Sequence, residues 1–237
     1  MPDPLPIPKR ALAIGAHPDD IEFGAGGTLA GWAAAGCAVT MLILTDGSKG
    51  TWDRSLTPAQ LAVIRRREQH AAAAALGAAN VIMLDYPDGE LEYSMALRSE
   101  VARHIRLTEP EMVLSHDPWL PYELHPDHRT AGWTAVDGVV AARDHLFFPE
   151  HELEPHRPAW LLLWRAATPD HWEDISNSFA PKLAALYCHE SQARSSMGTD
   201  LTPDTKPAFE ARMRAWAADL GRPAGLELAE AFRKLRP

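Results

Sequence analysis

Residues 11–20 read Ala-Leu-Ala-Ile-Gly-Ala-His-Pro-Asp-Asp, an apolar run that ends in an imidazole and two carboxylates. The run Ala11–Ala16 is typical of a strand that is buried inside a sheet. In open α/β sheets, ligands bind outside the carboxyl ends of the strands. We therefore expect the tetrad His17–Asp20 to lie at the functional edge of a sheet.

A second tetrad of the same kind, His125–His128, reads His-Pro-Asp-His and follows another apolar segment. One such tetrad alone is often only a turn with a solvated histidine. Two tetrads, each in the segment that follows an expected strand, favour a shared site. Ser48 and Asp88 also follow expected strands, so they are predicted to lie on the same rim.

Apolar and β-branched segments alternate along the chain with longer segments of helical character. Strands are expected at residues 11–16, 38–44, 81–84, 112–115 and 160–166. Helices are expected at residues 29–35, 57–76, 95–107, 129–142, 179–188, 208–220 and 226–235. This order predicts an α/β fold, a Rossmann-like three-layer sandwich with a mainly parallel sheet. Because no linker is evident, residues 1–237 are expected to form a single domain, with residues 193–237 as its helical extension.

Composition excludes several classes of protein. The formal net charge is −9 and Lys and Arg are dispersed, which argues against nucleic acid as a partner. Only two cysteines are present, Cys37 and Cys188, as is usual in a reducing compartment. Residues 1–6 are proline-rich without a secretion signal, and no apolar run is long enough for a membrane span. We expect a cytoplasmic protein with no membrane partner.

The tetrads contain enough ligands for one divalent metal. A catalytic zinc site has three protein ligands and one open position. His17 and Asp20 can converge on one ion, and His128 can supply the third ligand. Bound metal lowers the pKa of water from roughly 16 to about 7, so Asp19 beside the ligands suits a general base. His125 is left to stabilise an oxyanion or to protonate a leaving amine. Two His and one carboxylate also describe a ferrous (Fe²⁺) site.

Three motifs together resemble the signatures of the PIG-L/LmbE-like zinc N-deacetylases: Ala16–Asp20, Gly26–Thr28 and His125–Arg129. The resemblance runs from Ala11 to Gln192. That family includes deacetylases of the mycothiol and bacillithiol pathways, of glycosylphosphatidylinositol precursors and of chitobiose-type sugars. The resemblance implies the same Rossmann-like fold, and its trimeric and hexameric members imply a homo-oligomer.

The resemblance also implies roles for individual residues. His17, Asp20 and His128 would bind zinc, Asp19 would be the general base, and His125 the general acid or oxyanion-side group. The implied reaction removes the acetyl group from an N-acetylglucosamine-type sugar conjugate.

Weaker matches suggest residues that bind the substrate. Arg65 resembles a family arginine on the second helix, and Asp88 an aspartate that binds sugar hydroxyls, although Asp88 is equally typical of a turn. Ser48 lies where the second loop faces the site. Tyr122 precedes His125 by three residues, whereas the mycothiol branch has an oxyanion-side tyrosine two residues before its histidine.

Two other functions fit the same residues. A non-catalytic metal- or sugar-binding protein on this scaffold would need neither Asp19 nor His125, so their presence argues against it. A deacylase of another N-acyl substrate stays an open alternative, because nothing in the sequence indicates the size of the acyl pocket. A nucleotide-dependent oxidoreductase is disfavoured, since no Gly-x-Gly-x-x-Gly turn follows the first strand.

Overall fold

The computed structural model describes residues 5–237. The first four residues of the proline-rich start, on which the expectation of no secretion signal partly rests, lie outside this range. The strands are β1 Arg10–Gly15, β2 Ala38–Thr45, β3 Asn80–Tyr86, β4 Met112–His116, β5 Trp160–Trp164, β6 His171–Asp174 and β7 Ala229–Leu235. The helices are α1 Asp20–Ala34, α2 Pro58–Leu76, α3 Met95–Thr108, α4 Pro126–Arg143, α5 Phe179–Tyr187 and α6 Lys206–Gly221. Short 3₁₀ helices are η1 Pro149–His151, η2 Glu190–Gln192 and η3 Arg222–Ala224.

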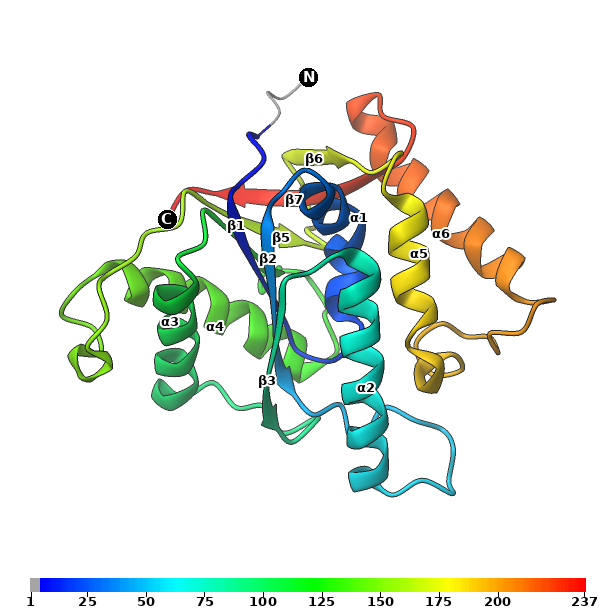
Figure 1. Ribbon diagram of the computed structural model, residues 1–237, viewed down its shortest axis with the longest axis horizontal. Coiled ribbons are helices and arrows are strands. Elements are labelled where there is room, and N and C mark those ends of the chain that lie inside the picture. Colours follow the sequence, from blue (N-terminus) through cyan, green and yellow to red (C-terminus); the bar gives the residue numbers. More distant parts are fainter. Residues whose placement is uncertain (1–4) are drawn as a thin grey trace.

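The strands form one sheet in the order β3-β2-β1-β4-β5-β7-β6. The first five strands are parallel, while β7 pairs antiparallel with both β5 and β6. Helices α3 and α4 cover one face, α1, α2 and α5 cover the other, and α6 lies outside α5 (Figure 1). The predicted α/β three-layer sandwich with a mainly parallel sheet is therefore confirmed.

Each layer is held by its own apolar contacts. One core joins the sheet to α1 and α2 and includes Trp32, Met41 and Trp164. A second core joins the sheet to α3 and α4 and includes Leu12 and Val101. A further cluster lies between α5 and α6. The sheet is thus buried on both sides, as its nearly continuous apolar strands predict.

Local sequence explains the boundaries of helix α2. Thr57 accepts a hydrogen bond from the backbone N–H of Gln60, and the Gln60 side chain accepts from the Thr57 N–H, which forms a capping box. Pro58 occupies the first turn, where a missing N–H costs nothing. Gly77 ends the helix in the left-handed conformation, at φ 75°. The sequence-based prediction for this helix is confirmed.

The prediction that the first helix begins at residue 29 is wrong, because α1 begins at Asp20 and includes the glycines of Gly24–Thr28. These glycines lower helix propensity but allow close packing. A Cβ at Gly24 would lie 2.6 Å from the Trp164 ring, and one at Gly27 would lie 2.7 Å from Ile175. Tertiary contact therefore outweighs the intrinsic cost of glycine in a helix.

The prediction of a helix at residues 226–235 is also wrong, since Ala229–Leu235 is strand β7. Its residues are good helix formers, but pairing with β5 and β6 decides the outcome. The carboxylate of Glu230 accepts from the N–H groups of Gly27 and Thr28 and pairs with Lys182. The helical extension expected for residues 193–237 is therefore limited to α6 and η3, and strand β6 had not been expected at all.

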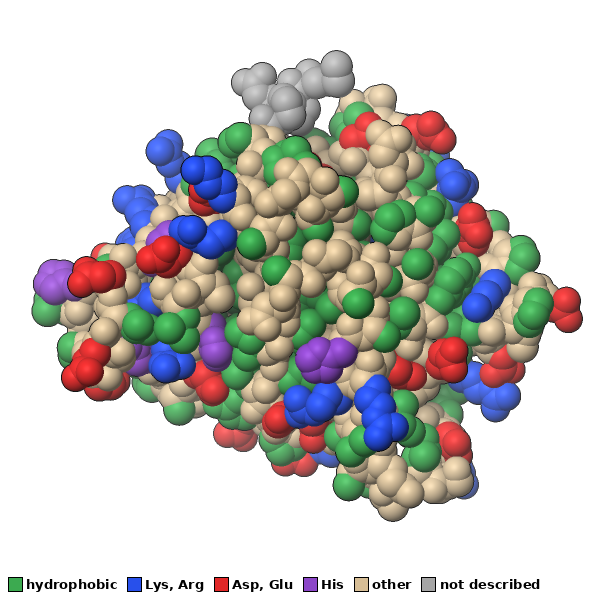
Figure 2. Space-filling model, viewed as in Figure 1, with side chains coloured by type: hydrophobic (Ala, Val, Ile, Leu, Met, Phe, Trp, Pro, Cys, Tyr) green, Lys and Arg blue, Asp and Glu red, His purple; other side chains and the backbone are tan. Residues whose placement is uncertain are grey.

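The charged side chains of the surface are mixed in sign. On the face shown in Figure 2, basic and acidic side chains are interspersed around the margin, and uncharged side chains cover the centre. Within residues 5–237, no helix combines the length and the apolar character that crossing a membrane requires.

Candidate functional site

Both tetrads meet at the carboxyl ends of β1 and β4, the neighbouring strands between which the chain reverses its direction across the sheet. A cavity of about 680 Å³ opens there. It is lined by His17, Asp19, Asp20, Phe23, Gly24, Lys49, Gly50, Arg65, Asp88, Gly89, His116, His125, His128, Trp164, Arg165, Gln192, Ser195, Ser196 and Trp216. The predicted convergence of the two tetrads is therefore present in the fold.

Asp20 lies among three imidazoles. One carboxylate oxygen, Oδ2, lies 3.3 Å from His17 Nδ1 and 3.3 Å from His116 Nε2. The other, Oδ1, lies 3.2 Å from His128 Nε2. Burial raises the pKa of Asp20, but the charges of His128 and His116 outweigh it and hold the pKa well below its usual value. Asp20 is therefore an anion at neutral pH.

Two carboxylates contact Nε2 of the His17 ring. Its Nε2 lies 3.0 Å from Asp127 Oδ2 and 3.2 Å from Asp88 Oδ1. With Nε2 engaged, Nδ1 is the nitrogen directed at Asp20. Burial lowers the pKa of His17, but hydrogen bonds to Asp127, Asp20 and Asp88 raise it well above its usual value. Burial raises the pKa of Asp88, but His17, the hydrogen bond from the Lys49 N–H and the charge of Arg65 lower it to about 2.

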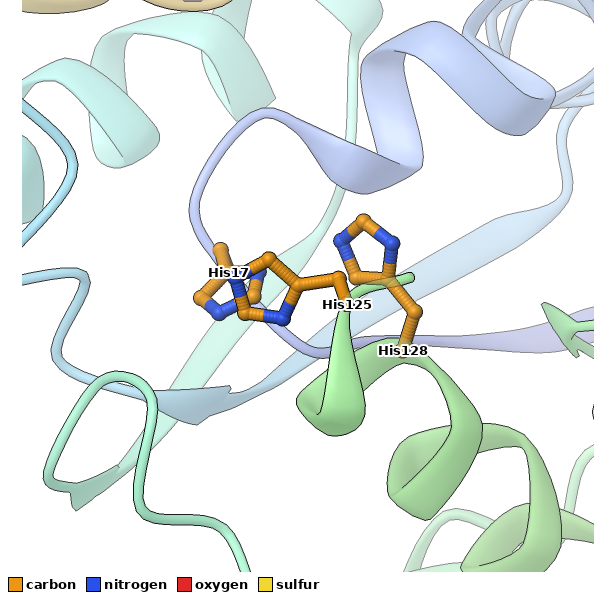
Figure 3. A group of neighbouring side chains, drawn as sticks. All are labelled: His17, His125 and His128. Atoms are coloured by element: carbon orange, nitrogen blue, oxygen red, sulfur yellow. The ribbon is translucent and has the colours of Figure 1, made fainter. Parts of the chain in front are cut away.

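The donor atoms fit a divalent metal. Two ligands bound tetrahedrally at about 2.1 Å from one zinc lie roughly 3.4 Å apart. The separations of 3.3 Å between His17 Nδ1 and Asp20 Oδ2, and of 3.2 Å between His128 Nε2 and Asp20 Oδ1, each match this spacing, with the two imidazoles facing different oxygens of Asp20. Donor atoms of His17, His125 and His128 also lie within 4.8 Å of one another, as do those of Asp20, His116 and His128. Figure 3 shows the rings of His17, His125 and His128 gathered between the β1 loop and the start of α4.

Asp19 lies next to this cluster with its carboxylate partly unpaired. It is the N-cap of α1, yet its side chain makes no capping hydrogen bond. Oδ1 lies 3.5 Å from Arg65 Nη2, and buried Oδ2 has no hydrogen-bond partner within residues 5–237. Burial and the charge of Asp20 raise the pKa of Asp19 above its usual value, although Arg65 opposes them. Such a carboxylate is able to accept a proton.

His125 is the N-cap of α4, and its Nδ1 accepts a hydrogen bond from the Asp127 N–H at 3.3 Å. The proton of the neutral ring is then on Nε2. Its ring centroid lies 4.5 Å from that of His17 and 4.7 Å from that of His128. Burial, together with the charges of His17 and His128, lowers the pKa of His125. The ring is thus a neutral donor beside the cluster.

Comparison with known proteins identifies the family. The model of the PIG-L family, described as GlcNAc-PI de-N-acetylase, matches residues 12–138, more than half of the chain. The chain belongs to the PIG-L family. The matched segment contains both tetrads, most of β1 and all of β2, β3 and β4.

Relatives cover almost the whole chain. The diacetylchitobiose deacetylase of Thermococcus kodakarensis is 35% identical over 98% of this chain and 85% of that protein. The solved N,N'-diacetylchitobiose deacetylase of Pyrococcus horikoshii, in complex with its inhibitor MPG, superimposes with a TM-score of 0.87. It is 33% identical and covers 97% of this chain and 84% of that one. Deacetylases of GlcNAc-type substrates are therefore among the homologues of this PIG-L protein.

A protein with another activity is also similar to this chain. The 4-carboxy-2-hydroxymuconate hydratase of Pseudomonas putida superimposes with a TM-score of 0.77 at 25% identity and covers 97% of both chains. Similarity to solved structures therefore does not by itself decide the reaction.

The residues predicted to bind substrate fall into two groups. Arg65 of α2 and Asp88 of the loop after β3 line the cavity. Ser48 is buried at the same edge, where its N–H donates to Asp46, but it does not line the cavity. Tyr122 is 95% exposed and lies outside the lining. This conformation does not bring Tyr122 to the site, so its role stays a prediction without support from the geometry.

Several residues near the site had not been assigned a role. Glu123 Oε1 accepts from the His125 N–H at 3.1 Å and lies 3.6 Å from His128 Nδ1, while Oε2 pairs with Arg165 at 3.2 Å. Gln69 contacts the backbone of Asp19. Glu123 is close enough to the second tetrad for sequence to suggest it, whereas the sequence positions of Gln69 and Arg165 indicate nothing of these contacts.

Proposed function

We propose that this PIG-L protein is a metal-dependent N-deacetylase of a small N-acetylglucosamine-type sugar conjugate. The observation that carries the proposal is the carboxylate of Asp19, which is buried at the cavity beside His17, Asp20 and His128, and whose Oδ2 has no partner among residues 5–237. A binding protein has no need of an unpaired basic carboxylate in that place. The deacetylases among its relatives support the same reaction.

His17, Asp20 and His128 would hold the metal. Zinc is the first candidate and Fe²⁺ the second, because two imidazoles and a carboxylate suit either ion. When bound, the metal would polarise the acetamide carbonyl and lower the pKa of water. Asp127 and Asp88 would orient His17 through Nε2, an arrangement that sets the tautomer of a ligand histidine and raises its basicity.

Asp19 and His125 would move the protons. Water adds to the acetamide carbonyl carbon while Asp19 accepts one of its protons. His125 donates a hydrogen bond through Nε2 to the carbonyl oxygen as negative charge develops there. The C–N bond then breaks, the sugar nitrogen takes a proton from Asp19 or His125, and acetate leaves with the free amine.

The cavity suits a sugar conjugate in size and chemistry. Its volume of about 680 Å³ lies within the usual range for small-molecule sites. Arg65 and Asp88 offer a donor and an acceptor for sugar hydroxyls on its walls. Ser48 and Tyr122 are proposed as weaker contributors, which would contact the substrate only after a local rearrangement. A homo-oligomer, trimer or hexamer, is also expected and is tested by light scattering after size-exclusion chromatography.

The proposal is tested by acetate release from N-acetylglucosamine and N,N'-diacetylchitobiose. Metal-free protein is reconstituted with zinc or with Fe²⁺ under anaerobic conditions, and metal content is measured in the same samples. We expect acetate release only after reconstitution, and none from Asp19→Asn protein with the same metal content. Full metal content without release from either sugar would contradict the proposal and favour another acyl group.

A hydratase is the second candidate, because the similar hydratase structure covers 97% of this chain. Hydration of 4-carboxy-2-hydroxymuconate, followed by its absorbance, is therefore measured with the same reconstituted samples. Turnover of that acid without acetate release would replace the deacetylase proposal.

A further inference from the structure

Asp19 has an unusual backbone conformation. Its φ is 99° and its ψ is −25°, a left-handed region that residues with a Cβ rarely occupy. Such a conformation persists only where the surroundings impose it. Within residues 5–237, the Asp19 carboxylate makes no capping hydrogen bond, and its one ion pair is with Arg65, at 3.5 Å. The direction of this carboxylate is therefore set chiefly by its backbone.

Gln69 of helix α2 is the side chain that contacts this backbone. Its Oε1 accepts from the Asp19 N–H at 3.3 Å, and its Nε2 donates to Glu22 Oε1 at 2.7 Å. Gln69 and Glu22 are both completely buried. Because a carboxylate oxygen accepts hydrogen bonds, the NH₂ of the Gln69 amide must face Glu22 and its oxygen must face Asp19. Glu22 thereby fixes the orientation of the amide.

The arrangement is related to a capping box. In a capping box, the glutamate three residues after the N-cap accepts directly from the N-cap N–H. Here Asp19 is the N-cap and Glu22 stands three residues later, but Gln69 is inserted between them. The inserted amide connects α2 to the start of α1 next to the cavity.

We propose that Gln69 and Glu22 are positioning residues that hold the Asp19 backbone, and with it the carboxylate, in the orientation that the reaction needs. This inference rests on the proposed function, which makes Asp19 the base. Replacing Gln69 by leucine keeps a similar volume but removes the acceptor for the Asp19 N–H. The carboxylate is then free to turn away from the cavity.

Amide hydrogen exchange tests the contact without any substrate. In ¹⁵N-labelled protein, we expect the Asp19 amide to exchange at least about tenfold faster in Gln69→Leu than in wild type. The Arg98 amide, which donates to Ser94 O at 3.0 Å in α3 on the other face of the sheet, is the internal control and should exchange at the wild-type rate. Equal exchange of Asp19 in both proteins would overturn the proposal.

A double-mutant cycle tests the consequence for the reaction. In wild-type background, we expect Gln69→Leu to lower kcat by about 10- to 100-fold, with KM and metal content nearly unchanged. In Asp19→Asn background, the same substitution should change kcat by less than about twofold, because the group it positions is already lost. A purely structural role predicts the same drop in both backgrounds, and that result would overturn the proposal.

Glu22 supplies a second pair of variants if Gln69→Leu does not fold. Glu22→Gln retains an oxygen that can accept from Gln69 Nε2 and should keep kcat near the wild-type value. Glu22→Leu removes the acceptor and should lower kcat as Gln69→Leu does. Equal kcat values for the two Glu22 variants would contradict the proposal that Glu22 positions Asp19 through Gln69. If wild type releases no acetate at all, the proposed function fails, while the exchange rate of Asp19 still decides whether Gln69 holds it.

Discussion

His17 Nε2 lies 3.0 Å from Asp127 Oδ2, so the first tetrad is bonded directly to the second. Asp127 also binds the loop between β3 and α3, because its carboxylate accepts from the N–H groups of Gly89 and Leu91. One completely buried carboxylate thus orients a proposed metal ligand and joins three loops at the edge of the sheet.

Removing the charge of this carboxylate should weaken metal binding. Asp127→Asn keeps the size of the side chain but makes a weaker acceptor for His17, so we expect metal affinity to fall by about 10- to 100-fold. Competition with a chelator measures the change. Asp137→Asn on the same helix is the matched control, since Asp137 contacts Tyr93 and not the cluster. Equal affinities for the two variants would mean that Asp127 does not support the metal.

Asp19 should affect turnover without affecting metal. Asparagine has the same shape as aspartate and tolerates left-handed conformations, so Asp19→Asn should fold normally. As it cannot accept a proton, we expect kcat to fall by about 10²- to 10⁴-fold at unchanged metal content. Initial rates of acetate release and metal analysis of the same sample check both statements. An unchanged rate would remove Asp19 from the base role.

His128 should behave in the opposite way. Its Nε2 lies 3.2 Å from Asp20 Oδ1 within the proposed ligand set, so His128→Ala should lose metal and activity together. His70→Ala on α2 is a control outside the cavity lining and should lose neither. Metal content of the purified variants, together with acetate release, tests this. Wild-type metal content in His128→Ala would show that the ligand set is wrong and would direct attention to His116, which also contacts Asp20.

The parallel part of the fold and the location of the site could be predicted from the sequence, because both depend on local patterns. Apolar runs such as Ala11–Ala16 predict buried strands. In a parallel sheet, the polar residues that follow each strand lie at the same edge. This reasoning brought His17 and His128 together correctly. The family resemblance added roles for these residues, which stay predictions.

The sequence-based predictions are wrong where contacts between residues far apart in the sequence decide the structure. β7 is a strand because it pairs with the edge of β5. Its Glu230 also accepts hydrogen bonds from Gly27 and Thr28, about two hundred residues earlier in the chain. The contact between Gln69 and Asp19 likewise depends on how α2 packs against α1. Neither relationship has a periodic or local signature in the sequence.

The glycines of α1 give a prediction about stability that is independent of function. A Cβ at Gly27 would lie 2.7 Å from the branched side chain of Ile175, whereas one at Gly31 would lie 3.5 Å from Ser178, an ordinary contact. Gly27→Ala should therefore destabilise the protein by about 1–3 kcal/mol through overpacking. Gly31→Ala should be neutral or stabilise it by up to about 1 kcal/mol, because alanine loses less entropy in a helix.

Urea denaturation of both variants compares the free energies of unfolding under identical conditions. The two substitutions add the same methyl group to the same helix, so helix propensity predicts the same change for both. Opposite signs would establish that close contact with Ile175, and not propensity, requires glycine at position 27. A Gly27→Ala variant as stable as Gly31→Ala would mean that α1 can move away from Ile175 without cost, and that this glycine is not needed for packing.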